Sequence, residues 1–221
     1  MVQTKIKICC ITSIAEAKLA LSFGADAIGL VGKMPSGPGP IGDTLIKEIA
    51  RSIPPPTATF LLTCKTSADK IIAHHKRTFT NTIQIVDQLP INDYAIIRNA
   101  IPAIKLVQII HVIDKSSVDE AIKISEHADA ILLDSGNPKL AIKELGGTGR
   151  KHDWKLSRKI VESIKIPVFL AGGLNAGNVR NAIDEVRPYG VDVCSGVRTN
   201  EQLDEKKLHA FFHAIEGVRR L

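Results

Sequence analysis

Short apolar runs alternate with amphipathic segments along the whole chain. The first run, residues 6–11, is rich in isoleucine and is predicted to be a strand buried on both faces. Apolar residues at helical spacing follow it, and Thr12 or Ser13 can cap the helix that they predict. Gly24 ends that helix, and residues 27–31 form the next buried run. The pattern therefore predicts a strand, a helix and a strand in turn.

The same alternation continues to the C-terminus and yields eight strand–helix pairs. Strands are predicted at residues 6–11, 27–31, 58–63, 82–86, 105–112, 130–134, 167–171 and 191–195. Helices are predicted from about residue 14 to Gly24, between Gly42 and Pro54, and at residues 68–76, 93–100, 116–127, 154–163, 176–186 and 204–215. Ser116 or Ser117 is the predicted cap of the fifth helix, and Asn175 that of the seventh.

Strands that alternate with helices form a parallel sheet, because each return path needs a crossover. Eight such pairs without a linker between them favour a closed barrel over an open, doubly wound sheet. We therefore expect a single α/β domain, residues 1–221, with the (β/α)₈ TIM-barrel fold.

Composition narrows the class of protein. Apolar residues make up 44% of the 221 residues and charged residues 24%, which excludes a disordered chain and a collagen-like chain. The net charge of +6 is spread out and only 4% of residues are aromatic, so a nucleic-acid partner is not expected. No apolar run reaches the roughly 20 residues of a membrane span, and no membrane partner is expected.

The four cysteines and the N-terminus indicate the compartment. Cys9, Cys10, Cys64 and Cys194 form no Cys-x-x-Cys pair, so we expect reduced thiols and no metal site. The first residues lack the apolar stretch of a secretory signal. These features predict a cytoplasmic protein.

In a barrel, the carboxyl ends of the strands and the loops after them form the active face. That rule selects Cys9 toward the end of the first strand, His111 toward the end of the fifth and Asp134 at the end of the sixth. The long loops at residues 32–42 and 135–152 are candidate lids.

Glycines follow the seventh and eighth strands. Gly172 and Gly173 come after one, and Ser195 and Gly196 after the other. Backbone without side chains at both turns lets amide groups approach an anion, and barrels commonly hold a substrate phosphate there. The alternative is that these glycines only make tight turns.

Two residues have the chemistry of an acid and a base. Asp134 ends a buried strand, where desolvation raises the pKa of a carboxyl group and lets it donate a proton. Cys9 can act as a thiolate base if a nearby positive charge lowers the pKa of its thiol. The alternatives are a helix cap or ion-pair partner for Asp134 and a core thiol for Cys9. Cys64 and Cys194 fit structural thiols.

Several motifs in order along the chain resemble the phosphoribosylanthranilate isomerase family. They are KICCIT at residues 7–12, GADAIG at 24–29, LLD at 132–134, GGTG at 146–149, DW at 153–154, AGGLN at 171–175 and RPYGVDVCSGV at 187–197. The resemblance implies an Amadori rearrangement of an N-linked aminoaldose phosphate to an aminoketose phosphate in tryptophan biosynthesis. It implies a small phosphorylated sugar as substrate, no cofactor and no metal, in a monomer or a homodimer.

The resemblance also assigns roles. Asp134 would protonate the ribose ring oxygen, and Cys9 would remove the proton from C2 of the opened sugar. Gly172, Gly173, Ser195 and Gly196 would hold the phosphate, and Asp192 would lie beside the ring-opening site. Gln84, Arg198 and His111 would be further substrate contacts.

The chain departs from the family pattern at four places. Gly39 stands where the family has an arginine that binds the anthranilate carboxylate, Cys10 replaces a glycine, and Arg198 stands where an acid is common. Val86 and Asp87 follow Gln84 and Ile85 where the family usually has a histidine-glycine pair. Loss of the arginine weakens a carboxylate ligand by about 2–5 kcal/mol unless Arg198, Lys33 or His111 compensates.

Two other functions remain open at this point. A related barrel could catalyse a different reaction of a phosphosugar, because many chemistries share this phosphate site. Alternatively, the barrel could bind a phosphorylated metabolite without turnover, which the altered loop favours and the presence of both Cys9 and Asp134 disfavours.

Overall fold

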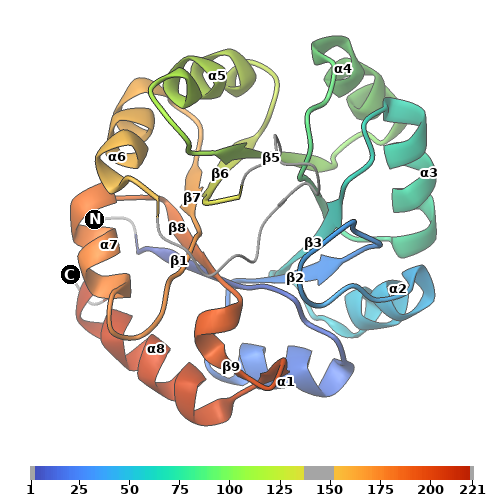
Figure 1. Ribbon diagram of the computed structural model, residues 1–221. Coiled ribbons are helices and arrows are strands. Elements are labelled where there is room, and N and C mark those ends of the chain that lie inside the picture. Colours follow the sequence, from blue (N-terminus) through green and yellow to red (C-terminus); the bar gives the residue numbers. More distant parts are fainter. Residues whose placement is uncertain (1–2, 137–151, 220–221) are drawn as a thin grey trace.

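Eight parallel strands form a closed barrel in the computed structural model, which describes residues 3–136 and 152–219 (Figure 1). The strands are β1 (Lys5–Ile8), β2 (Ala27–Val31), β3 (Ala58–Thr63), β4 (Thr82–Ile85), β5 (Lys105–His111), β6 (Ala130–Asp134), β7 (Val168–Leu170) and β8 (Gly190–Val193). Each pairs with the next, and β1 closes the barrel on β8 with Lys7 opposite Asp192. The predicted TIM barrel is confirmed.

Helices surround the barrel on its outside (Figure 1). They are α1 (Ile14–Ser22), α2 (Asp43–Ser52), α3 (Ala68–Thr78), α4 (Ile91–Ala100), α5 (Ser116–Ser125), α6 (Trp154–Ser163), α7 (Val179–Val186) and α8 (Glu205–Arg219). A short 3₁₀ turn (Ser195–Val197) and the small hairpin of β9 (Arg198–Thr199) and β10 (Gln202–Leu203) precede α8. No helix in these described ranges is both long and apolar enough to cross a bilayer.

Alternation along the strands divides the apolar residues between two layers. In β1, Ile6 and Ile8 are fully buried against the helices, whereas Lys7 and the following Cys9 face the barrel interior. The interior also holds Phe60 and Phe169, whose rings pack edge to face at 5.9 Å. The barrel is therefore a packed core with polar groups toward one end.

Strand and helix boundaries match the expectations closely, and three strands match at both ends. The first strand stops at Ile8 rather than residue 11, because Cys10 has a φ of 60° and breaks the extended backbone. Ser13 caps α1 as expected, since its Oγ accepts from the amide of Glu16 at 3.1 Å.

Two predicted caps are wrong. Lys115 occupies the N-cap position of α5, and the Asp114 side chain accepts from the amide of Ser116. Asn175 does not cap α7, because that helix begins at Val179 and the Asn175 side chain accepts from Gly177 instead. In both cases a polar side chain two residues earlier accepts from a backbone amide, at the first residue of α5 and within the turn before α7.

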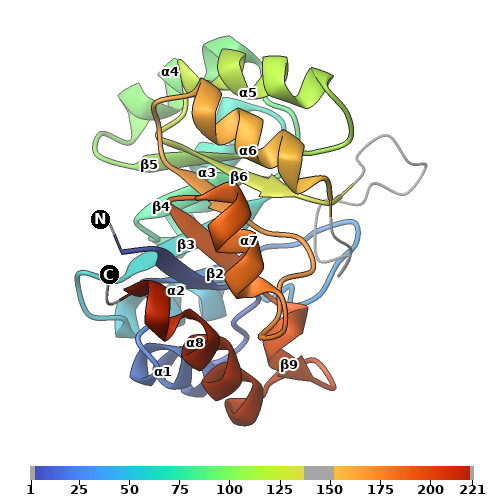
Figure 2. The same cartoon turned by 90° about the vertical axis from the view of Figure 1, so that its left-hand side faces the viewer.

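The loops after the carboxyl ends of the strands gather at one end of the barrel. Seen from the side, the loop between β2 and α2 and the β9 segment lie on the same side of the molecule (Figure 2). The β2–α2 loop is anchored by a backbone hydrogen bond of 2.9 Å from Ile41 to Val31. The proposed second lid, residues 135–152, falls almost entirely outside the described residues.

Candidate active site

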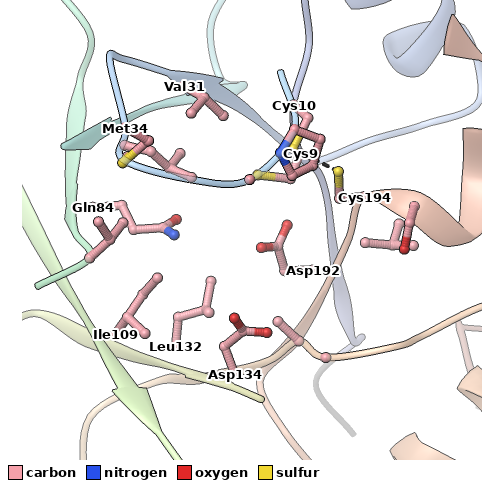
Figure 3. A pocket seen from close by; sticks show the side chains of 18 of the residues that line it. Cys9, Cys10, Val31, Met34, Gln84, Ile109, Leu132, Asp134, Asp192 and Cys194 are labelled. Carbon is pink, nitrogen blue, oxygen red and sulfur yellow. Dashed lines mark hydrogen bonds between the residues drawn. The ribbon is translucent and has the colours of Figure 1, made fainter. Parts of the chain in front are cut away.

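An open cavity of about 720 Å³ lies at the carboxyl ends of the strands. Its polar side chains include Cys9, Gln84, Asp134 and Asp192, which project toward one another from different strands (Figure 3). Ser36, Gly37 and Pro38 of the β2–α2 loop form part of its rim. The cavity is therefore where a parallel barrel carries its active site.

Cys9 and Asp134 line this same cavity, as the acid–base hypothesis requires. Figure 3 shows them on opposite sides of it, with Asp192 between them in this view. Both side chains are almost fully buried, each residue being 5% exposed. A small molecule in the cavity can contact both groups at once.

The pKa of the Cys9 thiol is lowered from its ordinary value. A hydrogen bond from the Cys10 thiol is the largest cause, and the neighbouring Lys7 ammonium lowers this pKa further. Burial and the charge of Asp192 act in the opposite direction. Cys9 therefore reaches its thiolate form more easily than an ordinary cysteine.

Lys7 and Asp192 form a buried ion pair beneath the cavity. The Lys7 Nζ lies 2.9 Å from Asp192 Oδ1, and the two side chains are 0% and 8% exposed. Burial by itself lowers the pKa of Lys7, but the charges of Asp192 and Cys9 raise it above its ordinary value. Lys7 is thus a cation beside Cys9, which is the positive charge that a thiolate base needs.

Burial raises the pKa of Asp134 to about 6, and the nearby charge of Asp192 adds to this effect. The backbone of Ser135 and Gly136 acts in the opposite direction. Asp134 Oδ2 has no hydrogen-bond partner among the described residues. A carboxyl group of this kind can hold a proton near neutral pH and transfer it to a ligand.

The turn after β7 presents backbone to the cavity. Gly172 and Gly173 have φ values of 86° and 63°, which glycine adopts without strain, and both line the cavity together with Ser195. The amide groups of these three residues have no hydrogen-bond partner among the described residues. They are available to an anion.

Gly196 has a different role from the other three phosphate-site candidates. A Cβ atom at this position would lie 2.0 Å from the carbonyl oxygen of Leu174, so only glycine lets the two turns pack together. Gly196 is not among the residues that line the cavity. It positions the two turns and does not itself face the ligand space.

The rest of the cavity combines one amide with an apolar wall. Gln84 is 1% exposed, and its Oε1 atom has no partner among the described residues. The apolar residues that line the cavity include Val31, Met34, Leu62, Val86, Ile109 and Leu132. This part of the cavity suits a ring with few polar groups.

Arg198 does not line the cavity, contrary to its expected role as a substrate contact. Its guanidinium is buried and pairs with Glu16 at 2.9 Å. It also donates to the carbonyl oxygens of Cys9 and Cys10. Because the protein itself uses these donors, Arg198 holds the end of β1 in place rather than binding a ligand.

His111 and Lys33 also lie apart from the cavity lining. His111 borders a smaller, adjoining cavity with Asp87 and Gln108, and burial lowers the pKa of its imidazole. Lys33 is exposed. Among the described residues that line the main cavity, none is an arginine or a lysine, so none of the three compensates there for the missing arginine at Gly39.

Lys7 was not predicted as a site residue. The sequence pattern could have indicated it, because a lysine between two isoleucines in a buried strand needs a partner that is also buried. The partner could not be predicted without the closure of β1 on β8. Within residues 3–136 and 152–219, no three His, Cys, Asp or Glu side chains are grouped so as to hold a metal ion.

Comparison with known proteins gives a family match over most of the chain. Residues 6–214 match the family described as N-(5'phosphoribosyl)anthranilate (PRA) isomerase. An N-(5'-phosphoribosyl)anthranilate isomerase 2 of Methanosarcina mazei is 36% identical over 215 residues, which cover 96% of this chain and 94% of that protein. The corresponding isomerase of Methanocella arvoryzae is 33% identical over 216 residues and 98% of each chain.

Solved structures agree with this match. Phosphoribosyl anthranilate isomerase from Thermotoga maritima has a TM-score of 0.83 and 29% identity, covering 97% of this chain and 99% of that one. A phosphoribosyl anthranilate isomerase in complex with reduced 1-(o-carboxyphenylamino)-1-deoxyribulose 5-phosphate has a TM-score of 0.80 and 26% identity over the same shares. That ligand carries a phosphate, an open sugar chain and a carboxyphenyl ring.

Proposed function

The chain belongs to the N-(5'-phosphoribosyl)anthranilate isomerase family and is an isomerase of tryptophan biosynthesis, and we propose that Cys9 and Asp134 are its general base and general acid. The observation that carries this assignment is the placement of both groups on one cavity with their pKa values shifted in opposite directions. The pKa of the thiol is lowered and that of the carboxyl is raised, which brings both toward neutral pH.

The reaction starts at Asp134. Its protonated carboxyl group donates a proton to the ribose ring oxygen, the bond between C1 and that oxygen breaks, and the anthranilate nitrogen forms an imine with C1. Asp192 lies beside this step, where its carboxylate form would favour a cationic imine. Burial raises the pKa of Asp192, and the charge of Lys7 at 2.9 Å opposes that rise. The unpartnered Oδ2 of Asp134 supports this role, because it is free to bond the sugar.

Cys9 acts in the second step. Its thiolate removes the proton from C2, the electrons of that C–H bond form a C1–C2 double bond, and the imine electrons return to nitrogen, which gives an enol-type intermediate. Protonation at C1 and loss of the proton from the enol hydroxyl then yield the ketone at C2. The hydrogen bond from Cys10 and the charge of Lys7 stabilise the thiolate in the interval between the two steps. Acid and base on opposite sides of the sugar allow both proton transfers in one bound geometry.

The phosphate of the substrate would bind at the turns after β7 and β8. The free amides of Gly172, Gly173 and Ser195 support this placement, and Gly196 keeps the two turns in contact. The apolar wall opposite these turns would hold the anthranilate ring. Gln84 would donate to or accept from the sugar hydroxyls, because its buried amide faces the cavity.

The assignment is tested by steady-state kinetics on the purified protein with N-(5'-phosphoribosyl)anthranilate. We expect Asp134→Asn and Cys9→Ser each to lower kcat/KM by about 10²–10⁴-fold. Cys64→Ala is the matched control, because the Cys64 thiol donates to the carbonyl of Lys33 and does not line the cavity. Unchanged turnover in either site variant would remove that residue from the mechanism.

The location and assembly belong to the same proposal. The enzyme would act in the cytoplasm, the compartment in which free cysteines such as its four are ordinary. It would act as a monomer or a homodimer, and light scattering of the purified protein distinguishes the two. One solved relative is described as monomers of a dimeric isomerase from Thermotoga maritima.

A further inference from the structure

The thiols of Cys10 and Cys194 contact each other at the mouth of the barrel. The Cys194 Sγ donates to the Cys10 Sγ across 2.6 Å, and both cysteines are free. Both line the active-site cavity, and Figure 3 shows the two sulfur atoms side by side next to Cys9. The acid–base mechanism uses Cys10 only as a hydrogen-bond donor and does not use Cys194.

The backbone brings this pair together from opposite ends of the chain. Strands β1 and β8 are neighbours in the barrel, and Ile8 lies opposite Val193 in their ladder. An extended Cys10 would face the helices, since Cys9 faces the interior and side chains alternate. Its φ of 60° instead turns the side chain toward the mouth, where it meets Cys194.

We propose that Cys10 and Cys194 form a reversible disulfide with a small-molecule disulfide such as oxidised glutathione as the oxidant, and that this bond inactivates the isomerase. Cys194 reacts first, because it is partly exposed whereas Cys10 is 5% exposed. Its thiolate attacks one sulfur of the oxidant and releases one small thiol, leaving a mixed disulfide on Cys194. The Cys10 thiol then loses its proton and attacks the Cys194 sulfur, which releases the second small thiol.

Inactivation follows from the place of Cys10 beside the base, and this part of the inference rests on the proposed role of Cys9. The Cys10 thiol is the hydrogen-bond donor to Cys9, and a disulfide sulfur has no proton to donate. The bond also ties the end of β1 to the residue before Ser195, whose amide faces the phosphate site. In the oxidised enzyme the pKa of Cys9 is therefore higher, less of Cys9 is in the thiolate form, and the phosphate turn is constrained.

Oxidised glutathione is added to the purified protein, followed by mass spectrometry and activity assays. We expect loss of two hydrogen atoms from the intact mass and a tryptic peptide of residues 8–18 joined to residues 181–198. Isomerase activity should fall by at least about tenfold, as for one unit of pKa at the base, and dithiothreitol should restore it. Cys64→Ala should behave like the parent protein.

Variants identify the bonded pair without relying on activity. In Cys9→Ser the linked peptide should still form, whereas in Cys10→Gly and Cys194→Ala it should be absent; Cys10→Gly suits the positive φ at that position. Circular dichroism confirms that each variant is folded. A linked peptide in Cys9→Ser supports the disulfide even if Cys9 proves not to be the base.

Three results would overturn the inference. The first is a glutathione adduct that remains on Cys194 without going on to a protein disulfide. The second is a disulfide between Cys9 and Cys10. The third is full isomerase activity in protein that has been converted completely to the Cys10–Cys194 disulfide.

Discussion

A Cβ atom built on Gly39 would lie 2.7 Å from the Cβ of Cys10. The sequence resemblance led us to expect a departure from the family pattern at both positions, and the structure shows that they are sterically linked. With Cys10 in place, residue 39 has no room for a side chain, and its φ of +75° also favours glycine. A side chain at residue 39 and the side chain of Cys10 therefore exclude each other where the β2–α2 loop packs on the end of β1.

Gly39→Arg alone should therefore destabilise the protein by about 1–3 kcal/mol, from overlap with Cys10 and from the left-handed backbone. Cys10→Gly removes the overlap, so the double variant should recover part of this loss, with a coupling energy of about 0.5–3 kcal/mol. The coupling energy is measured from the free energies of urea unfolding of the parent protein, the two single variants and the double variant. Gly42→Arg is the matched control, because nothing lies within 4 Å of its added Cβ. Strict additivity would contradict the steric link.

The same pair of substitutions should alter substrate binding. An arginine at position 39 restores a cation to a cavity whose described lining has none, so the double variant should show a lower KM for N-(5'-phosphoribosyl)anthranilate than Cys10→Gly alone. The value of kcat should change little, because the carboxylate is remote from the reacting bonds. An unchanged KM would place the carboxylate elsewhere.

Lys7→Met should cost about 3–5 kcal/mol of stability, because it leaves Asp192 buried without its cation. The double variant Lys7→Met with Asp192→Leu should regain most of this stability and yet remain inactive. Thermal or urea unfolding and steady-state assays measure the two effects separately. Recovery of activity along with stability would show that the ion pair has only a structural role.

The pH dependence of kcat/KM should be bell-shaped. The reactive form needs Asp134 protonated and Cys9 deprotonated. This form therefore increases up to the lower of the two pKa values, stays level between them and decreases above the higher one. Burial raises the pKa of Asp134 to about 6, and the pKa of Cys9 is lower than that of an ordinary cysteine. In Lys7→Met the alkaline limb should move to higher pH, because the charge of Lys7 lowers the pKa of both groups; an unmoved limb would contradict this account.

Gly173→Ala should affect phosphate binding, whereas Gly196→Ala should affect stability. Alanine at Gly173 strains a backbone with φ of 63° beside the proposed phosphate. The KM should therefore rise and inhibition by inorganic phosphate should weaken, while the protein stays folded. Alanine at Gly196 would overlap the carbonyl of Leu174 and should instead lower the midpoint of thermal unfolding. Equal effects of the two variants on both measurements would contradict the separate roles.

Much of this protein could be predicted from local patterns. Strand and helix periods are properties of neighbouring residues, which is why β2, β3 and β6 match their expected bounds and the barrel follows from their number. The rule that active residues lie at the carboxyl ends of barrel strands then brings Cys9 and Asp134 to one cavity. Neither step needs a contact between distant parts of the chain.

Tertiary structure alone decided the partners of the charged and thiol groups. The closure of β1 on β8 pairs Lys7 with Asp192 and Cys10 with Cys194, and no local pattern encodes a contact between the two ends of the chain. Arg198 was expected to contact the substrate, but in the folded protein it forms an ion pair with Glu16. A buried charge or donor bonds whichever group the packing brings within reach, because leaving it unpaired is costly, and only the three-dimensional arrangement determines that group.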